Sequence, residues 1–292
     1  MKQNGCLLAV MMTKVELGGW IIEKRALLRG KTEFPSIEIN AIASHYLQKP
    51  TSWIISHPET MLNSGQVQLL EDALTRLLAG EPLPYITGKK SFFGLDFIVD
   101  YRVLIPRPET EILVEQAISW LEAHPNMRKI IDIGTGSGAI AIALAKNMPG
   151  LQVTAVDTSA RALAVATANA SFHAVEKQIR FKRSNLFEQV GQKFDLVLAN
   201  LPYIPSNDLD SLAVSKYEPH EAFDGGSDGL RLITKLIDHL PEHVLPNGCA
   251  ILEIQYNQHN TIRDTASRRF PGASISIIKD LASIDRFVKI QL

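Results

Sequence analysis

One tetrapeptide of the sequence suits chemistry on a planar nitrogen group: Asn200, Leu201, Pro202 and Tyr203. It follows an apolar run, residues 196–199, which would deliver it to the carboxyl edge of a sheet. A primary amide or exocyclic amine is a poor nucleophile because its lone pair is delocalised. The Asn200 side-chain oxygen and a backbone carbonyl of the turn could each accept one N–H, while Tyr203 stacks on the flat group. Positioning of this kind, without a strong base, would support N-methylation.

A glycine-rich loop is the second candidate site. It consists of Gly134, Thr135, Gly136, Ser137 and Gly138, and it joins a candidate strand to a candidate helix. Glycine lets the chain turn sharply and lets a ligand touch the backbone, and free N–H groups at the helix N-terminus point to the same place. The loop predicts an adenosine-containing cofactor, but it fits a nicotinamide dinucleotide as well as a methyl donor.

Further residues would complete a cofactor site at this sheet edge. Asp157 ends the next candidate strand, where a carboxylate can accept both hydroxyls of a ribose. After the third strand, Asn185 could bond an adenine edge while Leu186 or Phe187 covers the ring, although Asn185 could equally hold a turn. Asp132, just before the glycine loop, either orders the cofactor's ammonium group through water or only caps a helix.

The elements that must position these residues alternate between strand and helix from residue 129 onward. The candidate strands are 130–133, 153–156, 179–182, 196–199, 250–254, 275–278 and 287–290, and the candidate helices include 139–147, 160–174, 230–240 and 258–269. Apolar strands separated by helices predict a largely parallel sheet covered on both faces. The last two strands are joined by too few residues for a crossover helix, so we expect them to pair antiparallel. This α/β pattern is typical of the class I methyltransferase (Rossmann-like) fold with a seven-stranded, mostly parallel sheet.

The chain before this α/β region has a different character. Residues 1–84 show apolar positions at helical spacing and Gly80 as a helix C-cap, which predicts a small all-helical N-terminal domain. Residues 85–105 carry two short aromatic and β-branched runs around Gly94, which predict a β-hairpin linker. The α/β domain would then occupy residues 106–292.

Composition excludes several classes of protein. The 30 basic and 31 acidic residues nearly cancel, which argues against a protein that grips nucleic acid through phosphates. Cys6 and Cys249 are far apart and the histidines are scattered, so we expect neither a disulfide framework nor a metal site. The apolar stretch 6–12 is too short for a membrane span, and we expect a cytoplasmic protein.

Several motifs together resemble one family, the peptide chain release factor glutamine methyltransferases (PrmC/HemK). The tetrapeptide at Asn200 is similar to the Asn-Pro-Pro-Tyr signature of amino-methyltransferases, with Leu201 in place of the first proline. Segments 82–88, 92–97, 103–111 and 218–230 match the family more specifically than the glycine loop does. The resemblance covers nearly the whole chain.

The resemblance implies transfer of a methyl group from S-adenosylmethionine to the glutamine amide of a release factor's Gly-Gly-Gln motif, giving N5-methylglutamine. It assigns the cofactor to the glycine loop, Asp157, Asn185, Leu186 and Asn200, and it assigns the glutamine to the tetrapeptide that begins at Asn200. The family usually has aspartate at position 185 and often an aromatic residue at 186. The domain of residues 1–84 would dock the release factor, and residues 106–292 would form the S-adenosylmethionine-dependent methyltransferase domain.

Other functions compete with this interpretation. A nucleic-acid methyltransferase acting on an adenine or guanine amino group uses the same Asn-x-Pro-Tyr logic on a flipped base. A non-enzymatic module could dock on a translation factor. A dehydrogenase would leave Asn200 and its neighbours without a role. Glu253, which ends a strand near the site, either orients the Asn200 turn or serves only as a helix cap or hydrogen-bond partner.

Overall fold

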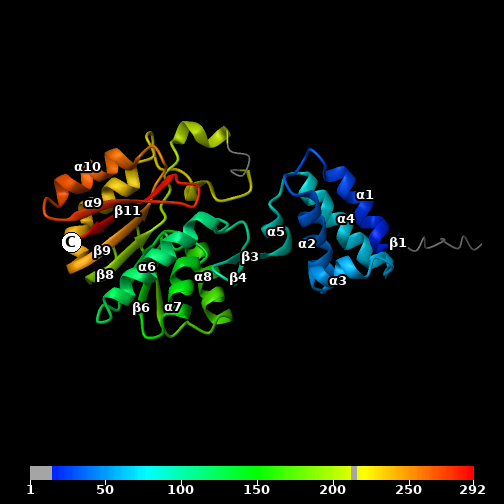
Figure 1. Cartoon of the computed structure of the whole chain (residues 1–292), viewed down its shortest axis with the longest axis horizontal. Coiled ribbons are helices and arrows are strands. Elements are labelled where there is room, and N and C mark those ends of the chain that lie inside the picture. Colours follow the sequence, from blue (N-terminus) through cyan, green and yellow to red (C-terminus); the bar gives the residue numbers. More distant parts are fainter. Residues whose placement is uncertain (1–14, 212–215) are drawn as a thin grey trace, which may run out of the picture. The chain divides into compact units, whose positions relative to one another are not determined.

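The computed structural model describes residues 15–211 and 216–292, and the chain divides into two compact units (Figure 1). The first unit ends at Thr87 and the second begins at Gly88. Cys6 and the apolar stretch 6–12 lie outside the described residues. No helix in the described part of the chain is long and apolar enough to cross a membrane.

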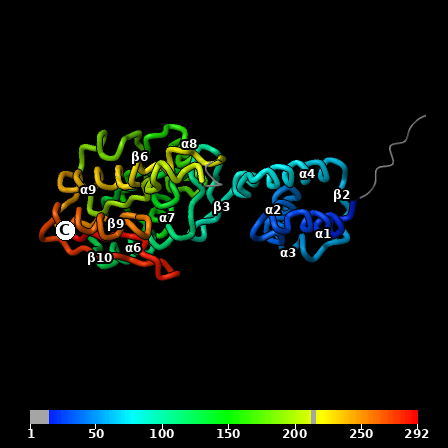
Figure 2. Tube along the Cα trace, turned by 90° about the horizontal axis from the view of Figure 1, so that it is seen from above, coloured from blue at the N-terminus to red at the C-terminus, as the bar shows by residue number. Residues whose placement is uncertain are grey.

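The first unit is built from helices. These are α1 (Leu17–Leu28), α2 (Pro35–Leu47), α3 (Thr51–Ser56), α4 (Ser64–Leu78) and α5 (Leu83–Thr87), which lie close together in Figure 2. Their buried faces share one apolar cluster that includes Trp20, Ile39 and Leu70. The structure adds one short antiparallel pairing, of β1 (Val15–Glu16) with β2 (Met61–Leu62), which is too short to leave a pattern in the sequence.

Local signals set the bounds of α4. Asn63 and Gln66 form a capping box, in which each side chain accepts a hydrogen bond from the other residue's backbone N–H. At the other end, Ala79 is the C-cap and Gly80 follows with φ +92°. Glycine adopts this left-handed conformation without steric cost, so the helix ends beside the glycine that the sequence marks.

The second unit begins with the hairpin of β3 (Lys89–Phe92) and β4 (Leu95–Ile98). Phe93 and Gly94 both have positive φ, which gives a two-residue turn suited to the strand twist. Asn169 accepts a hydrogen bond from the Ile98 N–H and donates to the Ile98 carbonyl, at 2.7 and 3.0 Å. The same Asn169 amide donates to the Ser137 carbonyl at 2.9 Å, so one side chain ties the hairpin to the glycine loop.

A seven-stranded sheet with the order β10-β11-β9-β8-β5-β6-β7 forms the centre of the second unit. Its strands are β5 (Lys129–Ile133), β6 (Gln152–Asp157), β7 (Ile179–Arg183), β8 (Phe194–Ala199), β9 (Val244–Glu253), β10 (Ser274–Lys279) and β11 (Asp285–Gln291). Strands β7, β6, β5, β8 and β9 run parallel, whereas β11 pairs antiparallel with both β9 and β10. The predicted seven-stranded, mostly parallel sheet with a final antiparallel pair is confirmed.

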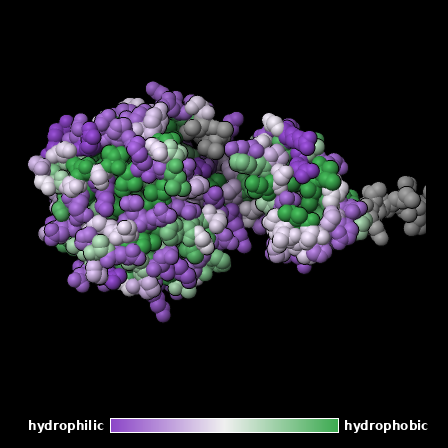
Figure 3. Space-filling model, in the orientation of Figure 1, coloured by the Kyte–Doolittle hydropathy of each residue, from purple (hydrophilic) through white to green (hydrophobic). Residues whose placement is uncertain are grey.

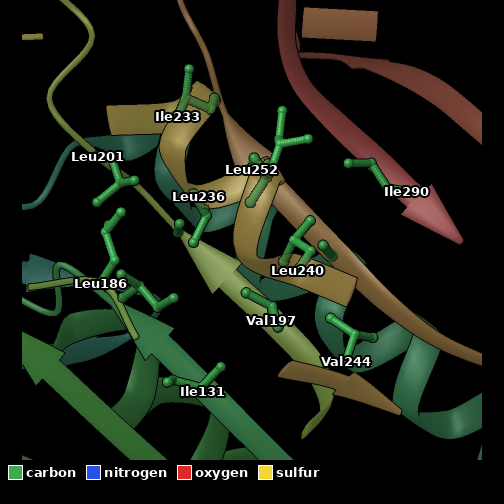
Figure 4. Packing of buried hydrophobic residues seen from close by; sticks show 14 of the residues in the cluster. Ile131, Leu186, Val197, Leu201, Ile233, Leu236, Leu240, Val244, Leu252 and Ile290 are labelled. Atoms are coloured by element: carbon green, nitrogen blue, oxygen red, sulfur yellow. The ribbon is translucent and has the colours of Figure 1, made fainter. Parts of the chain in front are cut away.

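Helices cover both faces of this sheet. They are α6 (Glu111–Ala123), α7 (Ala139–Asn147) and α8 (Ala160–Phe172) in one layer, and α9 (Arg231–His243) and α10 (His259–Arg269) in the other. Alternate residues of β5 point to opposite faces, so Ile131 and Ile133 join the core beneath α9. Figure 4 shows Ile131 and Val197 of the sheet in this core with Leu236 and Leu240 of α9.

Candidate active site

The carboxyl ends of four parallel strands bring the predicted residues to one edge of the sheet. Gly134 follows β5, Asp157 ends β6, Asn185 follows β7 and Asn200 follows β8. They line one cavity at this edge. Predicted residues in this lining are Gly134, Gly136, Asp157, Asn185, Leu186, Asn200, Leu201 and Pro202. Three other loop residues, Thr135, Ser137 and Gly138, are not among the described residues that line it.

The glycine loop is shaped by backbone conformations that favour glycine. Gly134, Gly136 and Gly138 all have positive φ, between 54° and 84°. A Cβ on Gly138 would lie 2.9 Å from Ile142 Cδ1 and 3.2 Å from Ala166 Cβ, so this glycine lets α7 pack against α8. Gly134 lies close to the Asn200 turn, since a Cβ there would lie 3.4 Å from the Asn200 carbonyl oxygen.

Asp157 joins the loop to the end of β6. One carboxylate oxygen accepts the Gly136 N–H at 2.9 Å, and the other accepts the Ser159 N–H at 2.8 Å. Each oxygen has a further lone pair, so the carboxylate can still accept ribose hydroxyls from the cavity. Burial raises the pKa of Asp157 above its ordinary value, and the two backbone hydrogen bonds oppose this shift.

Asp132 lies under the loop and is fully buried. Its Oδ2 accepts the Thr135 hydroxyl at 2.6 Å, while its Oδ1 has no hydrogen-bond partner in the described part of the chain. Burial raises the pKa of Asp132 to about 7. A buried acceptor without a partner fits a group that hydrogen-bonds to a cofactor cation.

The segment after β7 divides between two environments. Leu186 lines this cavity and adopts φ 51°, whereas Phe187 points away from it and stacks on His243 with ring centroids 4.1 Å apart. Of the two residues proposed to cover an adenine ring, the structure therefore places only Leu186 at the cavity. The Asn185 side chain also lines it, and its Nδ2 donates to Glu188 at 2.7 Å.

Asn200 is held by residues far away in the sequence. Its Nδ2 donates to the Thr110 hydroxyl at 3.0 Å, and that hydroxyl donates to Glu253 Oε2 at 2.8 Å. Neither Asn200 Oδ1 nor the Leu201 carbonyl accepts a hydrogen bond within the part of the chain that the structure describes. Two acceptors are therefore available at the cavity wall.

A second cavity shares part of its wall with the first. Both cavities are lined by Asn200, Leu201 and Pro202. The second cavity is also lined by Tyr203, Arg107 and Phe223, which do not line the first. The Tyr203 hydroxyl donates to Glu253 Oε1 at 3.3 Å, which fixes the ring, and burial raises the Tyr203 pKa. The second cavity thus offers a fixed aromatic ring beside one side-chain acceptor, Asn200 Oδ1, and one backbone acceptor, the Leu201 carbonyl.

Several residues that build the site were not predicted from the sequence as functional. Glu218, whose side chain is fully buried, accepts from Arg107 at 2.6 Å and from the Ile105 N–H at 2.9 Å. Gln258 Nε2 donates to the Tyr203 carbonyl at 3.0 Å. Thr110 and Arg107 stand in the segment 103–111 that carries the family resemblance, and this was the only signal for them. No group of three or more metal-binding side chains occurs among the described residues.

Known proteins similar to this chain decide its family. Residues 20–88 match the PrmC N-terminal domain and residues 110–216 match the methyltransferase small domain. A release factor glutamine methyltransferase of Koribacter versatilis is 36% identical over 265 residues, covering 88% of this chain and 91% of that protein. The chain belongs to the release factor glutamine methyltransferase family. A further member, from Geobacter sulfurreducens, is 41% identical over 210 residues, covering 71% of this chain and 72% of the relative.

Solved structures agree on the fold of this family member. A methyltransferase from Pyrococcus furiosus is 19% identical, with a TM-score of 0.50 over 76% of this chain and 98% of that one. The hMettl16 catalytic domain, solved in complex with the MAT2A 3'UTR hairpin 6, is 14% identical. Its TM-score is 0.51 over 80% of this chain and 84% of that one. These likenesses support the class I methyltransferase fold.

S-adenosylmethionine is the cofactor of this release factor glutamine methyltransferase family member. The residues present fit that molecule. The free lone pairs of Asp157 suit ribose hydroxyls, and the buried Asp132 Oδ1, which does not line the cavity, suits an ammonium group reached only through water. Leu186 offers an apolar side chain to a base, and Gly134 and Gly136 let the ligand approach the backbone.

Proposed function

We propose that this enzyme transfers a methyl group from S-adenosylmethionine to the side-chain amide of the glutamine in the Gly-Gly-Gln motif of peptide chain release factors, giving N5-methylglutamine. The observation that carries the proposal is the pair of free acceptors, Asn200 Oδ1 and the Leu201 carbonyl, where the two cavities meet. A primary amide has two N–H groups, and two acceptors can fix both. The family's named substrate, a release factor glutamine, carries such an amide.

The proposed catalysis depends on position. When bound, S-adenosylmethionine supplies an electrophilic methyl group. Asn200 Oδ1 and the Leu201 carbonyl hold the glutamine nitrogen so that it faces this methyl, and Tyr203 packs against the planar amide. Transfer would form a nitrogen–methyl bond and break the sulfur–methyl bond, and the nitrogen, made strongly acidic, would release one proton to water. No base of raised strength is needed.

We further propose that the first unit docks the release factor. Three isoleucines of its helices, Ile22, Ile37 and Ile55, are each more than 60% exposed, and Figure 3 shows hydrophobic groups on the surface of this unit. Exposed apolar residues that gather on one domain commonly mark protein interaction sites. A Gly-Gly-Gln loop alone offers little contact area, so a second surface would add affinity. Because release factors act on ribosomes, we propose a cytoplasmic location.

Incubation with labelled S-adenosylmethionine and a bacterial release factor tests this function. We expect one label per factor, on the Gly-Gly-Gln glutamine, located by peptide mass. A release factor with that glutamine changed to glutamate is the matched control, since it lacks the amide nitrogen but keeps the docking surface. Label on nucleic acid in the same mixture, with none on the factor, would contradict the proposal and favour a base methyltransferase.

A further inference from the structure

The two ends of an asparagine carboxamide have nearly the same shape and opposite hydrogen-bonding roles. Oδ1 accepts hydrogen bonds, whereas Nδ2 only donates them. If Asn200 rotated by half a turn, it would present two donors to a substrate nitrogen that also carries hydrogens. Gripping an amide N–H therefore requires that something hold Asn200 in one of two orientations.

Thr110 is the partner that can distinguish these orientations. Its hydroxyl carries a single proton, and it donates that proton to Glu253 Oε2 at 2.8 Å. The same hydroxyl is then left only with lone pairs toward Asn200, and it accepts from Nδ2 at 3.0 Å. In the reversed orientation, Oδ1 would face another acceptor, and this contact is repulsive.

Glu253 sets the direction of this chain of hydrogen bonds. It is only 2% exposed, and its two oxygens are both used, one by Thr110 and the other by the Tyr203 hydroxyl at 3.3 Å. Burial raises the pKa of Glu253 to about 7, so above that pH the carboxylate is ionised, has no proton to give and accepts from both neighbours. The proton of Thr110 is thus committed to Glu253, and Asn200 must be the donor in the last contact.

The fold brings the three residues together at one edge of the sheet. Asn200 directly follows β8 and Glu253 ends the neighbouring parallel strand β9, so both lie at the carboxyl edge of the sheet. Thr110 ends the 3₁₀ helix η1 (Pro108–Thr110), just before α6, and is 5% exposed. Two neighbouring strand ends thus supply two of the residues, and segment 107–111 supplies the third.

We propose that Thr110 and Glu253 are positioning residues which lock the Asn200 carboxamide with its oxygen toward the substrate nitrogen. The inference rests on the proposed function, because it concerns the same acceptor. Neither residue need touch the substrate or cofactor. Thr110 is absent from the lining of both cavities in the described part of the chain, as is Glu253.

Kinetics of Thr110 variants test the proposal. Thr110→Val keeps the shape but removes the hydroxyl, and we expect kcat for release factor methylation to fall about tenfold to a hundredfold, as when the support of a ligand-gripping group is lost. The affinity for S-adenosylmethionine should stay unchanged. Thr110→Ser restores a hydroxyl and should recover most of the rate.

A double-mutant cycle separates positioning from general damage. If Thr110 acts through Asn200, then Thr110→Val should change the rate less than about twofold in a chain that already carries Asn200→Ala. Equal losses in both backgrounds would mean that Thr110 only supports the fold, and this would overturn the proposal.

Neutron diffraction from deuterium-exchanged crystals of the unaltered protein gives an answer that does not depend on activity or on a variant that folds. We expect two deuterons on the Asn200 atom that faces Thr110 and one on the Thr110 oxygen directed at Glu253. A reversed amide would overturn the inference even if release factor methylation is observed. Conversely, correct deuteron positions in a protein that does not methylate release factors would leave the lock intact and refute the proposed substrate.

Discussion

Gly134 of the glycine loop lies directly against Leu201 of the turn that begins at Asn200, since a Cβ on Gly134 would be 3.1 Å from Leu201 Cδ2. The glycine also has φ +75°, a conformation that costs other residues about 1–2 kcal/mol. Gly134→Ala should therefore both strain the loop and push the turn away. We expect weaker S-adenosylmethionine binding by calorimetry and a lower kcat for methylation.

Gly150 provides a matched control for the backbone strain. It has φ +89°, but a Cβ there would meet no atom within 4 Å. Gly150→Ala should lower thermal stability to a similar degree while cofactor affinity and kcat stay normal. If both variants impaired catalysis equally, the contact between loop and turn would have no functional importance.

Asp157→Ala should weaken S-adenosylmethionine binding by about tenfold to a hundredfold, because a hydrogen bond to a charged group contributes about 1.5–3 kcal/mol. Asp195→Ala is the matched control. The Asp195 carboxylate also accepts two backbone N–H groups, those of Arg128 and Lys129, but it does not line the described cavity wall. Calorimetry should show normal cofactor affinity for the Asp195 variant. Unchanged affinity after loss of Asp157 would mean that the ribose binds elsewhere.

Short-range patterns in the sequence were enough to predict most strands and the pairing of the last two. The strand before the glycine loop, predicted as 130–133, is Lys129–Ile133, and the final antiparallel pair follows from the short segment between β10 and β11. The predicted strand 250–254 was too short, because β9 runs from Val244 to Glu253 through polar and glycine residues that hide its first half. Periodicity cannot reveal such a segment.

The site was predictable where one strand end supplies one residue, and not where distant residues meet. Asn200 and Asp157 could be placed because each ends a recognisable strand. The contact of Asn200 with Thr110 joins residues 90 positions apart, and that of Thr110 with Glu253 joins residues 143 apart. Their pairing depends on how α6 packs beside β8 and β9, which no local pattern specifies.

Glu253 should make stability depend on pH in an uncommon direction. Burial raises its pKa from 4.5 to about 7, while Thr110, Arg286 and Tyr203 act to lower it and Glu109 raises it further. The folded chain therefore binds more protons than the unfolded chain between pH 4.5 and 7, so the free energy of unfolding falls as pH rises through this window. Asp132 contributes in the same direction, because burial also raises its pKa to about 7. Glu253→Gln should therefore remove only the Glu253 part of this pH dependence, a total change of about 3 kcal/mol at most.

Urea unfolding at a series of pH values measures the effect of Glu253. Asp100→Asn is the control, because Arg102 lowers the pKa of Asp100 below 3.8. A lowered pKa stabilises the folded chain above the unfolded value, and that contribution is lost only as pH falls below it. The two variants should therefore differ from the unaltered protein in separate pH ranges. A Glu253→Gln curve parallel to that of the unaltered protein would contradict the prediction.

Removal of the first unit should weaken methylation of an intact release factor while sparing the cofactor site. The cut belongs after Thr87, because α5 extends to that residue and Ile86 is part of the helical unit's core. Residues 88–292 should bind S-adenosylmethionine normally and methylate a short Gly-Gly-Gln peptide as the full chain does. With the whole factor we expect a raised KM. An unchanged KM for the whole factor would show that the first unit is not a docking surface.

The last prediction compares two neighbouring residues in the turn that begins at Asn200. Asn200→Ala removes a free acceptor and should reduce kcat by about a hundredfold or more. Leu201→Pro restores the proline that the family signature has at this position. The Leu201 N–H donates no hydrogen bond within the described residues, so proline costs none there, and Pro202 already biases residue 201 toward extended conformations.

The remaining effect of Leu201→Pro comes from two opposed changes. A stiffer turn should gain about 0.4–1 kcal/mol, while the loss of a 7% exposed leucine side chain that contacts Gly134 opposes this gain. We therefore expect turnover to change by no more than a few-fold, because the backbone carbonyl of residue 201 remains. Steady-state methylation of a release factor measures both variants, and thermal unfolding confirms that each folds. The opposite result would be an active Asn200→Ala variant and an inactive but folded Leu201→Pro variant. That result would mean that this turn does not hold the glutamine amide through the two acceptors assigned to it.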